Sequence, residues 1–221
     1  QGNEVENLEK GQNILKAYYK GLWSKQPALL DSFQDGKSVL IVVDMVNGFV
    51  REGKMKNALA EELVDPIGNL MKKCRERGLP IVAFADSHPE NSPEFDIFER
   101  HCEKGTSETE LLKEFQEVGG YALIEKNSTN GFLEEEFQKW LESHPDVTDF
   151  IVTGVCTDIC VMQFTLTLKA WLNKVCKKSR VVVPLDCVET YDYGFHQITL
   201  VNTMAVFFME QAGIEIVSEV Q

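Results

Sequence analysis

Val39-Leu-Ile-Val-Val-Asp44 is a run of five aliphatic residues that ends on an aspartate. Five further short runs rich in β-branched and other apolar residues follow along the chain, at Pro80–Phe84, Tyr121–Glu125, Phe150–Thr153, Val181–Pro184 and Ile214–Val217. Continuous apolar strands are typical of a parallel sheet, because its strands are buried on both faces. We therefore interpret the six runs as the strands of one mainly parallel sheet.

Helix-like stretches separate the strands, near residues 58–77, 108–117, 132–143, 158–173 and 196–212. Gly78 follows the first of them directly before the strand at Pro80, where a helix is expected to end. Strands that alternate with helices predict an α/β fold of three layers, with a doubly wound, mainly parallel sheet of about six strands. The length of this part, residues 37–221, fits a single domain.

Residues 1–36 differ from the rest of the chain and form an N-terminal extension. Apolar residues recur there at roughly helical spacing, at Leu8, Ile14, Leu15, Tyr18, Leu22 and Trp23. This pattern predicts an amphipathic helix that packs on the domain. A contact between two copies of the chain is the alternative, which leaves a homo-oligomer open.

The composition excludes several classes of function. A formal net charge of −13 argues against nucleic acid, since phosphate binding relies on clustered Lys and Arg. No apolar run approaches the roughly 18 residues of a membrane span, and residues 1–10 lack the pattern of a signal peptide. We expect a cytoplasmic protein without a membrane partner. Its six cysteines have no disulfide-type spacing and are expected to be free thiols.

Reactive side chains follow four of the predicted strands. Asp44 ends the first strand, Asp86 and His88 follow the second, Lys126 follows the third, and a turn after the fourth leads to Cys160. In doubly wound sheets, ligands bind outside the carboxyl ends of the strands. We therefore expect these side chains to meet at one edge of the sheet.

The turn after the fourth strand reads Thr153-Gly-Val-Cys-Thr-Asp-Ile-Cys160. Gly154 permits a sharp turn, and Thr157 or Asp158 can cap the following helix. Cys160 then lies in the first helical turn, where the helix dipole is expected to lower its pKa and favour a thiolate. The N–H groups of the same turn can stabilise an oxyanion.

A cysteine is more often a small buried hydrophobe than a nucleophile, and we assign that role to Cys74, Cys102, Cys176 and Cys187. Cys156 and Cys160 are four residues apart, which allows a metal clip or a redox pair. No further Cys/His pair at zinc-site spacing lies in this segment, however. We interpret Cys160 as a nucleophile, Asp44 as its proton acceptor and Lys126 as the cation that keeps Asp44 ionised.

Three segments together resemble the isochorismatase-like cysteine hydrolases: Leu40-Ile-Val-Val-Asp-Met-Val-Asn-Gly-Phe49, Glu125-Lys126, and Gly154-Val-Cys-Thr-Asp-Ile-Cys-Val161. The resemblance extends over about residues 37–217. It implies a Rossmann-like fold and a catalytic triad of Asp44, Lys126 and Cys160. It also implies a cis peptide between Val155 and Cys156, with the N–H groups of Cys156 and Cys160 as the oxyanion hole.

A second group of residues follows the second strand: Asp86, His88, Glu94 and His101, ahead of Cys102-Glu-Lys-Gly-Thr106. Two imidazoles with one or two carboxylates suit a catalytic divalent metal such as zinc, whereas a lone loop histidine is usually only solvated. The pattern resembles the metal site of nicotinamidases within this superfamily. By that resemblance Asp86, His88 and His101 are ligands, with Glu94 as a fourth through water.

The resemblance implies a metal-dependent hydrolase that converts nicotinamide, a small amide, to nicotinate and ammonia through a cysteine thioester, as in NAD salvage. Phe49 would line the substrate ring, although an ordinary core phenylalanine is the alternative. Two positions depart from the family. Gly48 stands where Asp is more common, and Thr129 stands where some relatives place Tyr. These departures bear on the substrate more than on the chemistry.

Two other functions stay open at this point. One is another amidohydrolase of the superfamily that acts on a carbamoyl or ureido compound. Activity of the metal-free protein would favour this alternative. The other is a catalytically silent binding module. The intact Asp-Lys-Cys set argues against the silent module, because the chain retains the residues that the chemistry requires.

Overall fold

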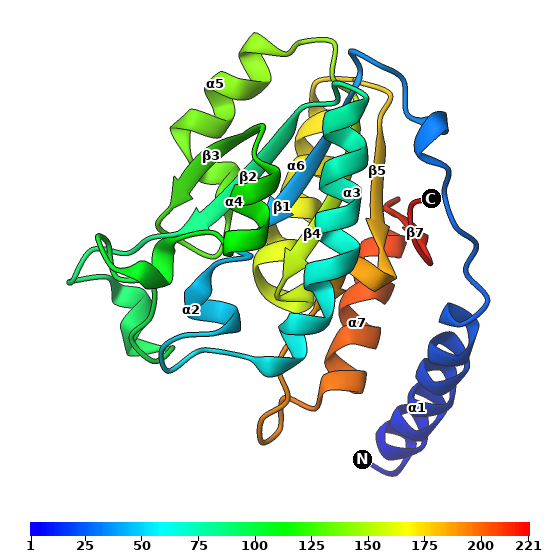
Figure 1. The fold of residues 1–221 in the computed structure, drawn as a ribbon. Helices are drawn as coiled ribbons and strands as arrows, with labels where there is room; N and C mark the ends of the chain where they lie inside the picture. The colour runs from blue at the N-terminus through cyan, green and yellow to red at the C-terminus, as the bar shows by residue number, and fades with distance from the viewer.

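A computed structural model describes all 221 residues and contains one parallel sheet between two layers of helices (Figure 1). The strands are β1 (Ser38–Val43), β2 (Ile81–Asp86), β3 (Tyr121–Lys126), β4 (Asp149–Val155), β5 (Arg180–Pro184), β6 (Val188–Glu189) and β7 (Glu215–Val217). Their order is β3-β2-β1-β4-β5-β7, with β6 beside β4, and every pair is parallel. The predicted fold class and all six predicted strands are confirmed. The two-residue β6 is additional, and it is too short to leave a pattern in the sequence.

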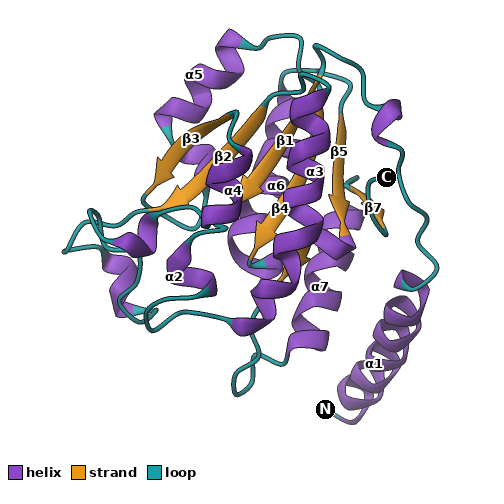
Figure 2. Cartoon of the chain, in the orientation of Figure 1, coloured by secondary structure: helices purple, strands orange, loops and turns teal.

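The helices are α1 (Gly2–Leu22), α2 (Asn47–Val50), α3 (Val64–Glu76), α4 (Lys113–Val118), α5 (Glu135–Ser143), α6 (Met162–Lys174) and α7 (Ile198–Gln211). Helices cover both faces of the sheet (Figure 2), and a separate apolar core lies on each face. One contains residues of α3 and α4, and the other contains residues of α5, α6 and α7. Successive residues of β1 alternate between the two cores. Burial on both faces explains why this strand is apolar throughout.

Some helix boundaries differ from the predicted ones. The stretch expected as a helix at 58–77 begins with a 3-10 segment, Ala58–Leu63, and becomes α-helical only at Val64. Pro66 lies in the first turn of α3, where its missing N–H costs no hydrogen bond. The stretch at 158–173 begins with a π-helical turn, Thr157–Val161, before α6 starts at Met162.

The predicted N-terminal helix is present as α1, but none of its residues is buried. Its C-terminal part contacts α7, where the rings of Tyr18 and Phe207 are 5.2 Å apart and Tyr18 donates a hydrogen bond to Glu210. Leu8 and Ile14 are 66% and 67% exposed. Packing of α1 is therefore confined to its C-terminal end, whereas Ala28, Leu30 and Phe33 of the extension are buried in the core. The domain boundary near residue 36 stays a prediction.

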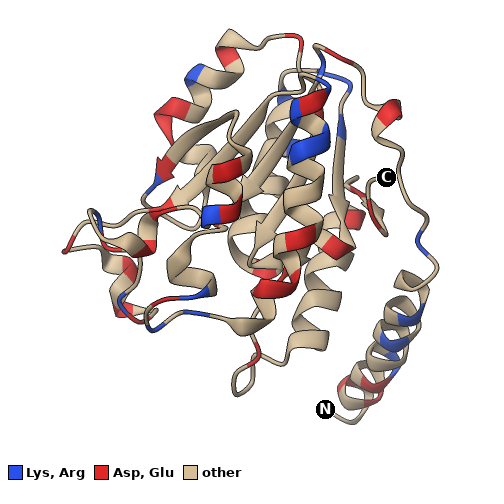
Figure 3. Cartoon of the chain, viewed as in Figure 1, with Lys and Arg blue, Asp and Glu red and all other residues tan.

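Acidic side chains are spread over most helices and loops rather than gathered in one patch (Figure 3). The net charge of −13 is therefore diffuse rather than concentrated at one site. None of the helices is long and apolar enough to cross a membrane.

Candidate active site

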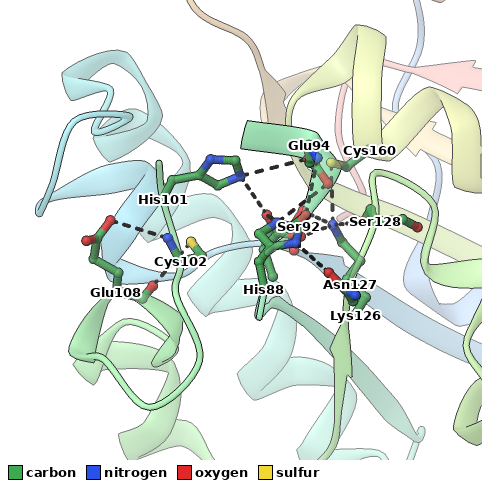
Figure 4. Close-up of polar contacts among 12 residues, drawn as sticks. His88, Ser92, Glu94, His101, Cys102, Glu108, Lys126, Asn127, Ser128 and Cys160 are labelled. Carbon is green, nitrogen blue, oxygen red and sulfur yellow. Dashed lines mark hydrogen bonds and ion pairs between the residues drawn. The ribbon is translucent and has the colours of Figure 1, made fainter. Parts of the chain in front are cut away.

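The carboxyl ends of four neighbouring strands bring the predicted reactive side chains together. Lys126, the last residue of β3, lies at the centre of this group (Figure 4). Its Nζ atom is 2.8 Å from Asp44 Oδ2, 2.8 Å from Asp86 Oδ1 and 3.5 Å from Cys160 Sγ. It also donates a hydrogen bond to the carbonyl of Ser128. The predicted convergence at one sheet edge is therefore present, with all these side chains buried.

Gly154 allows the two central strands to approach each other directly below the site. It pairs with Val43 at the end of β1 and has a φ of 118°. A Cβ at this position would lie 2.0 Å from the Val43 carbonyl oxygen. Only glycine fits this approach, because it has no side chain and tolerates positive φ. Asp44, the next residue after β1, also has positive φ (55°), a conformation that aspartate tolerates better than most residues. The Val155–Cys156 peptide is cis, as the family resemblance implies.

The turn that carries Cys160 is held differently from the sequence-based expectation. Neither Thr157 nor Asp158 caps a helix, since the turn begins at Cys156 without a side-chain cap. The Asp158 carboxylate instead accepts hydrogen bonds from Thr190 and His196. These partners lie more than 30 residues away along the chain, so a local pattern could not reveal them. The N–H of Cys156 has no hydrogen-bond acceptor within the protein, as an oxyanion donor requires.

The predicted low pKa of Cys160 is wrong. Burial raises the pKa of this thiol well above its ordinary value, and nearby Asp44 and Asp86 add to the shift against the opposing effect of Lys126. The helix-terminus effect is worth about 1 kcal/mol at an exposed position, which is less than the cost of a buried thiolate near carboxylates. The thiol therefore keeps its proton in the free protein.

Asp44 and Lys126 form a buried ion pair with shifted pKa values. Burial raises the pKa of Asp44 to about 6, although the Lys126 ammonium opposes the shift. Burial lowers the pKa of Lys126, but Asp44 and Asp86 outweigh this effect and raise it well above its ordinary value. The pair thus provides a carboxylate that can accept a proton near neutral pH, next to a permanent positive charge.

The four predicted metal-binding residues also lie together. Asp86, His88, Glu94 and His101 each offer a ligand atom, and these atoms all lie within 4.8 Å of one another. Nε2 of His88 is 2.6 Å from Asp86 Oδ2 and 3.6 Å from Glu94 Oε2. Nε2 of His101 is 3.1 Å from Asp86 Oδ2 and 3.8 Å from Glu94 Oε1.

In both histidines, Nδ1 makes a hydrogen bond away from the group and leaves Nε2 free to bind a cation. Nδ1 of His101 is 2.6 Å from the Glu99 carbonyl oxygen, which can only accept, so Nδ1 carries a proton. Nδ1 of His88 is 2.8 Å from Asn127 Oδ1. In the neutral rings the Nε2 lone pairs therefore face the carboxylate oxygens of Asp86 and Glu94. A divalent cation between these four acceptors would remove the conflict, and such outer hydrogen bonds are the usual support of metal-bound histidines.

Both groups border one cavity of about 500 Å³. Its wall includes Cys156 and Cys160 on one side and Glu94 and His101 on another. Phe49 and Thr129, the two residues predicted to contact substrate, also line it. The ring of Phe49 lies 5.4 Å from that of His101, and the Thr129 hydroxyl donates to Gln163. A small molecule in this cavity can therefore touch the thiol and the metal-binding residues at once.

Comparison with known proteins agrees with this geometry. The isochorismatase domain model matches residues 38–215. The chain belongs to the isochorismatase family. Nicotinamidase 1 of Arabidopsis thaliana is 30% identical over 186 residues, which cover 77% of this chain and 72% of that protein. Members of this family are mostly hydrolases.

Two solved structures show the same fold. The N-carbamoylsarcosine amidase of Thermoplasma acidophilum is 26% identical with a TM-score of 0.69, covering 82% of this chain and 95% of the other. The pyrazinamidase of Pyrococcus horikoshii, solved in complex with zinc, is 25% identical with a TM-score of 0.68, covering 82% of this chain and 98% of the other. The N-terminal helix α1 lies outside the matched family domain.

In this isochorismatase-family chain, the glycine that departs from the family pattern has a packing explanation. A Cβ at Gly48 would lie 2.8 Å from Cys102 Sγ and 2.9 Å from Glu108 Cβ. Cys102 directly follows the candidate ligand His101, and its N–H donates to the Glu108 carboxylate (Figure 4). Cys102 and Glu108 therefore occupy the space that a larger side chain at position 48 would need. Both belong to the connection that carries the candidate metal ligands.

Sequence reasoning missed several parts of the cavity wall, among them residues 54–57, 97–99 and 191–193. Tyr191, Asp192 and Tyr193 line it, and His196 lies behind them. The segment Tyr191-Asp-Tyr-Gly-Phe-His196 is rich in aromatic residues, which is the only signal that could have drawn attention to it. It follows β6, which was itself too short to predict.

Proposed function

We propose that this protein is a nicotinamidase, a metal-dependent hydrolase that converts nicotinamide to nicotinate and ammonia through a thioester on Cys160. The observation that carries the proposal is the shared cavity, which Cys160 lines together with Glu94 and His101 of the candidate metal group. The similarity to Nicotinamidase 1 supports the same substrate. This activity would place the protein in NAD salvage.

Asp86, His88, His101 and Glu94 would hold the metal, with zinc as the candidate because the similar pyrazinamidase was solved with zinc. A divalent ion bound there would supply a Lewis acid for an electron-pair donor of the substrate, such as its pyridine nitrogen. Phe49 lies beside His101 and would contact the ring. The carboxamide is then directed toward Cys160.

In the first half of the reaction, Asp44 accepts the proton of the Cys160 thiol as the sulfur attacks the carboxamide carbon. A C–S bond forms, and the N–H groups of Cys156 and Cys160 stabilise the oxyanion. Asp44 then passes the proton to the amide nitrogen. The C–N bond breaks, ammonia leaves, and a nicotinoyl thioester remains on Cys160. Because the resting thiol is protonated, transfer to Asp44 has to accompany the attack.

In the second half, Asp44 accepts a proton from water as the water oxygen attacks the thioester carbon. The C–S bond breaks, the sulfur regains its proton from Asp44, and nicotinate is released. Lys126 stays charged throughout, between Asp44 and Asp86. Its charge balances Asp44 while that residue is ionised, and it links the nucleophile to a metal ligand through one ammonium group.

A panel of amides tests the substrate. Ammonia release by purified protein is measured with nicotinamide, pyrazinamide and N-carbamoylsarcosine at equal concentrations, with Cys160→Ser as the blank. We expect nicotinamide to give the highest kcat/KM. Turnover of N-carbamoylsarcosine in preference to both pyridine-type amides would contradict the proposal and favour the carbamoyl amidase alternative.

A further inference from the structure

The cavity wall formed by Tyr191 and Tyr193 has little apolar packing of its own. Tyr193 is 82% exposed, and Phe195, two residues later, is fully exposed. Exposed loop residues of this kind contribute little burial energy to hold a loop in one position. The position of this wall therefore depends on the polar contacts made by the segment Thr190–His196.

Two of these contacts end on one carboxylate. Thr190 Oγ1 donates to Asp158 Oδ1 at 2.6 Å, and His196 Nε2 lies 2.8 Å from Asp158 Oδ2. The side chains of Asp158 and His196 are only 15% and 19% exposed. Asp158 belongs to the same π-helical turn as Cys160 and precedes it by two residues. The wall is thus attached to the turn that carries the nucleophile.

The His196 ring also fixes Tyr191 itself. Its Nδ1 lies 2.8 Å from the Tyr191 carbonyl oxygen, and the two rings are stacked with centroids 3.8 Å apart and an interplanar angle of 10°. Both acceptors, a carbonyl and a carboxylate, can only accept hydrogen bonds. The two ring nitrogens lie on opposite sides of the imidazole, so this one ring spans the gap between the Tyr191 carbonyl and the Asp158 carboxylate.

We infer that His196 is a positioning residue that holds the Tyr191–Tyr193 wall at a set distance from Cys160 by bridging Asp158 and the Tyr191 carbonyl. The inference rests on the proposed function for its substrate, since the wall would contact the substrate in the cavity. His196 itself touches no reacting atom in this account. Its loss would widen the cavity, weaken substrate binding and expose Cys160.

Steady-state kinetics with nicotinamide separates this role from general damage. His196→Ala should raise KM about tenfold or more, the effect of a lost hydrogen bond to a charged group, while kcat changes less. His196→Gln can restore the contact with Asp158 but not the one with the Tyr191 carbonyl and should recover part of the loss, whereas His196→Asn is too short to reach Asp158 and should recover less. An unchanged KM in His196→Ala, or a fall in kcat alone, would overturn the inference.

A matched histidine provides the control. His144 is likewise stacked on an aromatic ring, that of Trp140 at 4.0 Å, and its Nδ1 lies 2.8 Å from the Trp140 carbonyl. It directly follows α5 as the C-cap residue and does not border the cavity. His144→Ala should leave KM unchanged. An equal rise in KM in this variant would show that the effect is not specific to the bridge.

Alkylation by iodoacetamide tests the bridge without using the enzymatic reaction. Cys160 is 7% exposed, so it should react slowly in the wild type and several-fold faster in His196→Ala, as followed by peptide mass mapping. Fully buried Cys74 reports on folding and should stay unlabelled. If the wild type does not hydrolyse nicotinamide, the proposed function fails while this measurement still decides the bridge. Equal labelling of Cys160 in both proteins would overturn it.

Discussion

The Lys126 ammonium is 2.8 Å from a carboxylate oxygen of Asp44 and 2.8 Å from one of Asp86. One buried cation therefore joins the residue that would accept the thiol proton to a residue that would bind the metal. Removing one partner of such a buried pair leaves an uncompensated charge and is strongly destabilising. For this reason Cys160, which is not a partner in these ion pairs, is a better site than Asp44 or Lys126 for testing the chemistry.

Replacement of the nucleophile should abolish turnover. Cys160→Ala is expected to lower kcat for ammonia release by at least about 1,000-fold, because no other side chain can form the thioester. Cys176→Ala is the matched control, since Cys176 is exposed and outside the cavity, and it should keep wild-type activity. Residual activity of Cys160→Ala near the wild-type level would remove this residue from the nucleophile role.

The pH profile should follow Asp44. This carboxyl group works only when ionised, and burial raises its pKa to about 6. The value of kcat/KM should therefore be constant above this pH and fall about tenfold per unit as the pH drops below it. The measurement is kcat/KM for nicotinamide between pH 4.5 and about 8 in buffers of equal ionic strength. A kcat/KM that stays nearly constant across this whole range, as an ordinary carboxyl group would give, would contradict this assignment.

At the scale of elements, the short helix α2 and the loop that carries His101 are packed together through Gly48 and Cys102. The loop contains three of the four candidate metal ligands, His88, Glu94 and His101, between β2 and α4. It has no long helix or strand of its own. Its geometry therefore depends on contacts with neighbouring elements such as α2.

Restoring the aspartate that is common in the family should be unfavourable in this chain. Gly48→Asp would place side-chain atoms against Cys102 and Glu108, and overpacking of this kind costs about 1–3 kcal/mol. Urea unfolding measures the change in stability. Gly11→Asp, at an exposed position with open space around it, is the control for adding the same charge.

A double variant gives the reason for the effect. In Gly48→Asp with Cys102→Ala, loss of the sulfur atom should recover part of the stability, while the contact with Glu108 remains. The effects of two substitutions on the free energy of unfolding are generally not additive when the residues are in contact. A Gly48→Asp protein as stable as the wild type would show that the loop moves freely and that the packing explanation is wrong.

At the scale of the whole molecule, α1 lies at one side of the domain and outside the matched family region (Figure 1). Deletion of Gly2–Leu22 should leave the fold and the activity in place, with a loss of about 1–2 kcal/mol at most, because none of its residues is buried. Thermal unfolding and ammonia release check this. A deletion variant that is insoluble or inactive would show that α1 is part of the domain.

The parts of the fold that followed from sequence are those that depend on local patterns and general sheet geometry. Runs such as Val39–Val43 identify buried strands, and parallel pairing then brings Asp44, Asp86 and Lys126 to one edge. What could not be predicted depends on tertiary contacts. Asp158 was expected to cap a helix but binds His196, and Cys160 was expected to be a thiolate but is too deeply buried. The apolar face of α1 indicated a helix but not how little of it is covered.

The most direct test of the central claim is metal dependence of ammonia release from nicotinamide. Wild-type protein is assayed as prepared, after chelator treatment and after zinc is restored, with bound metal measured at each stage and His88→Ala treated in parallel. The account predicts that activity and bound metal are lost together and return together, and that both are low in His88→Ala. Full activity in metal-free wild type would contradict it.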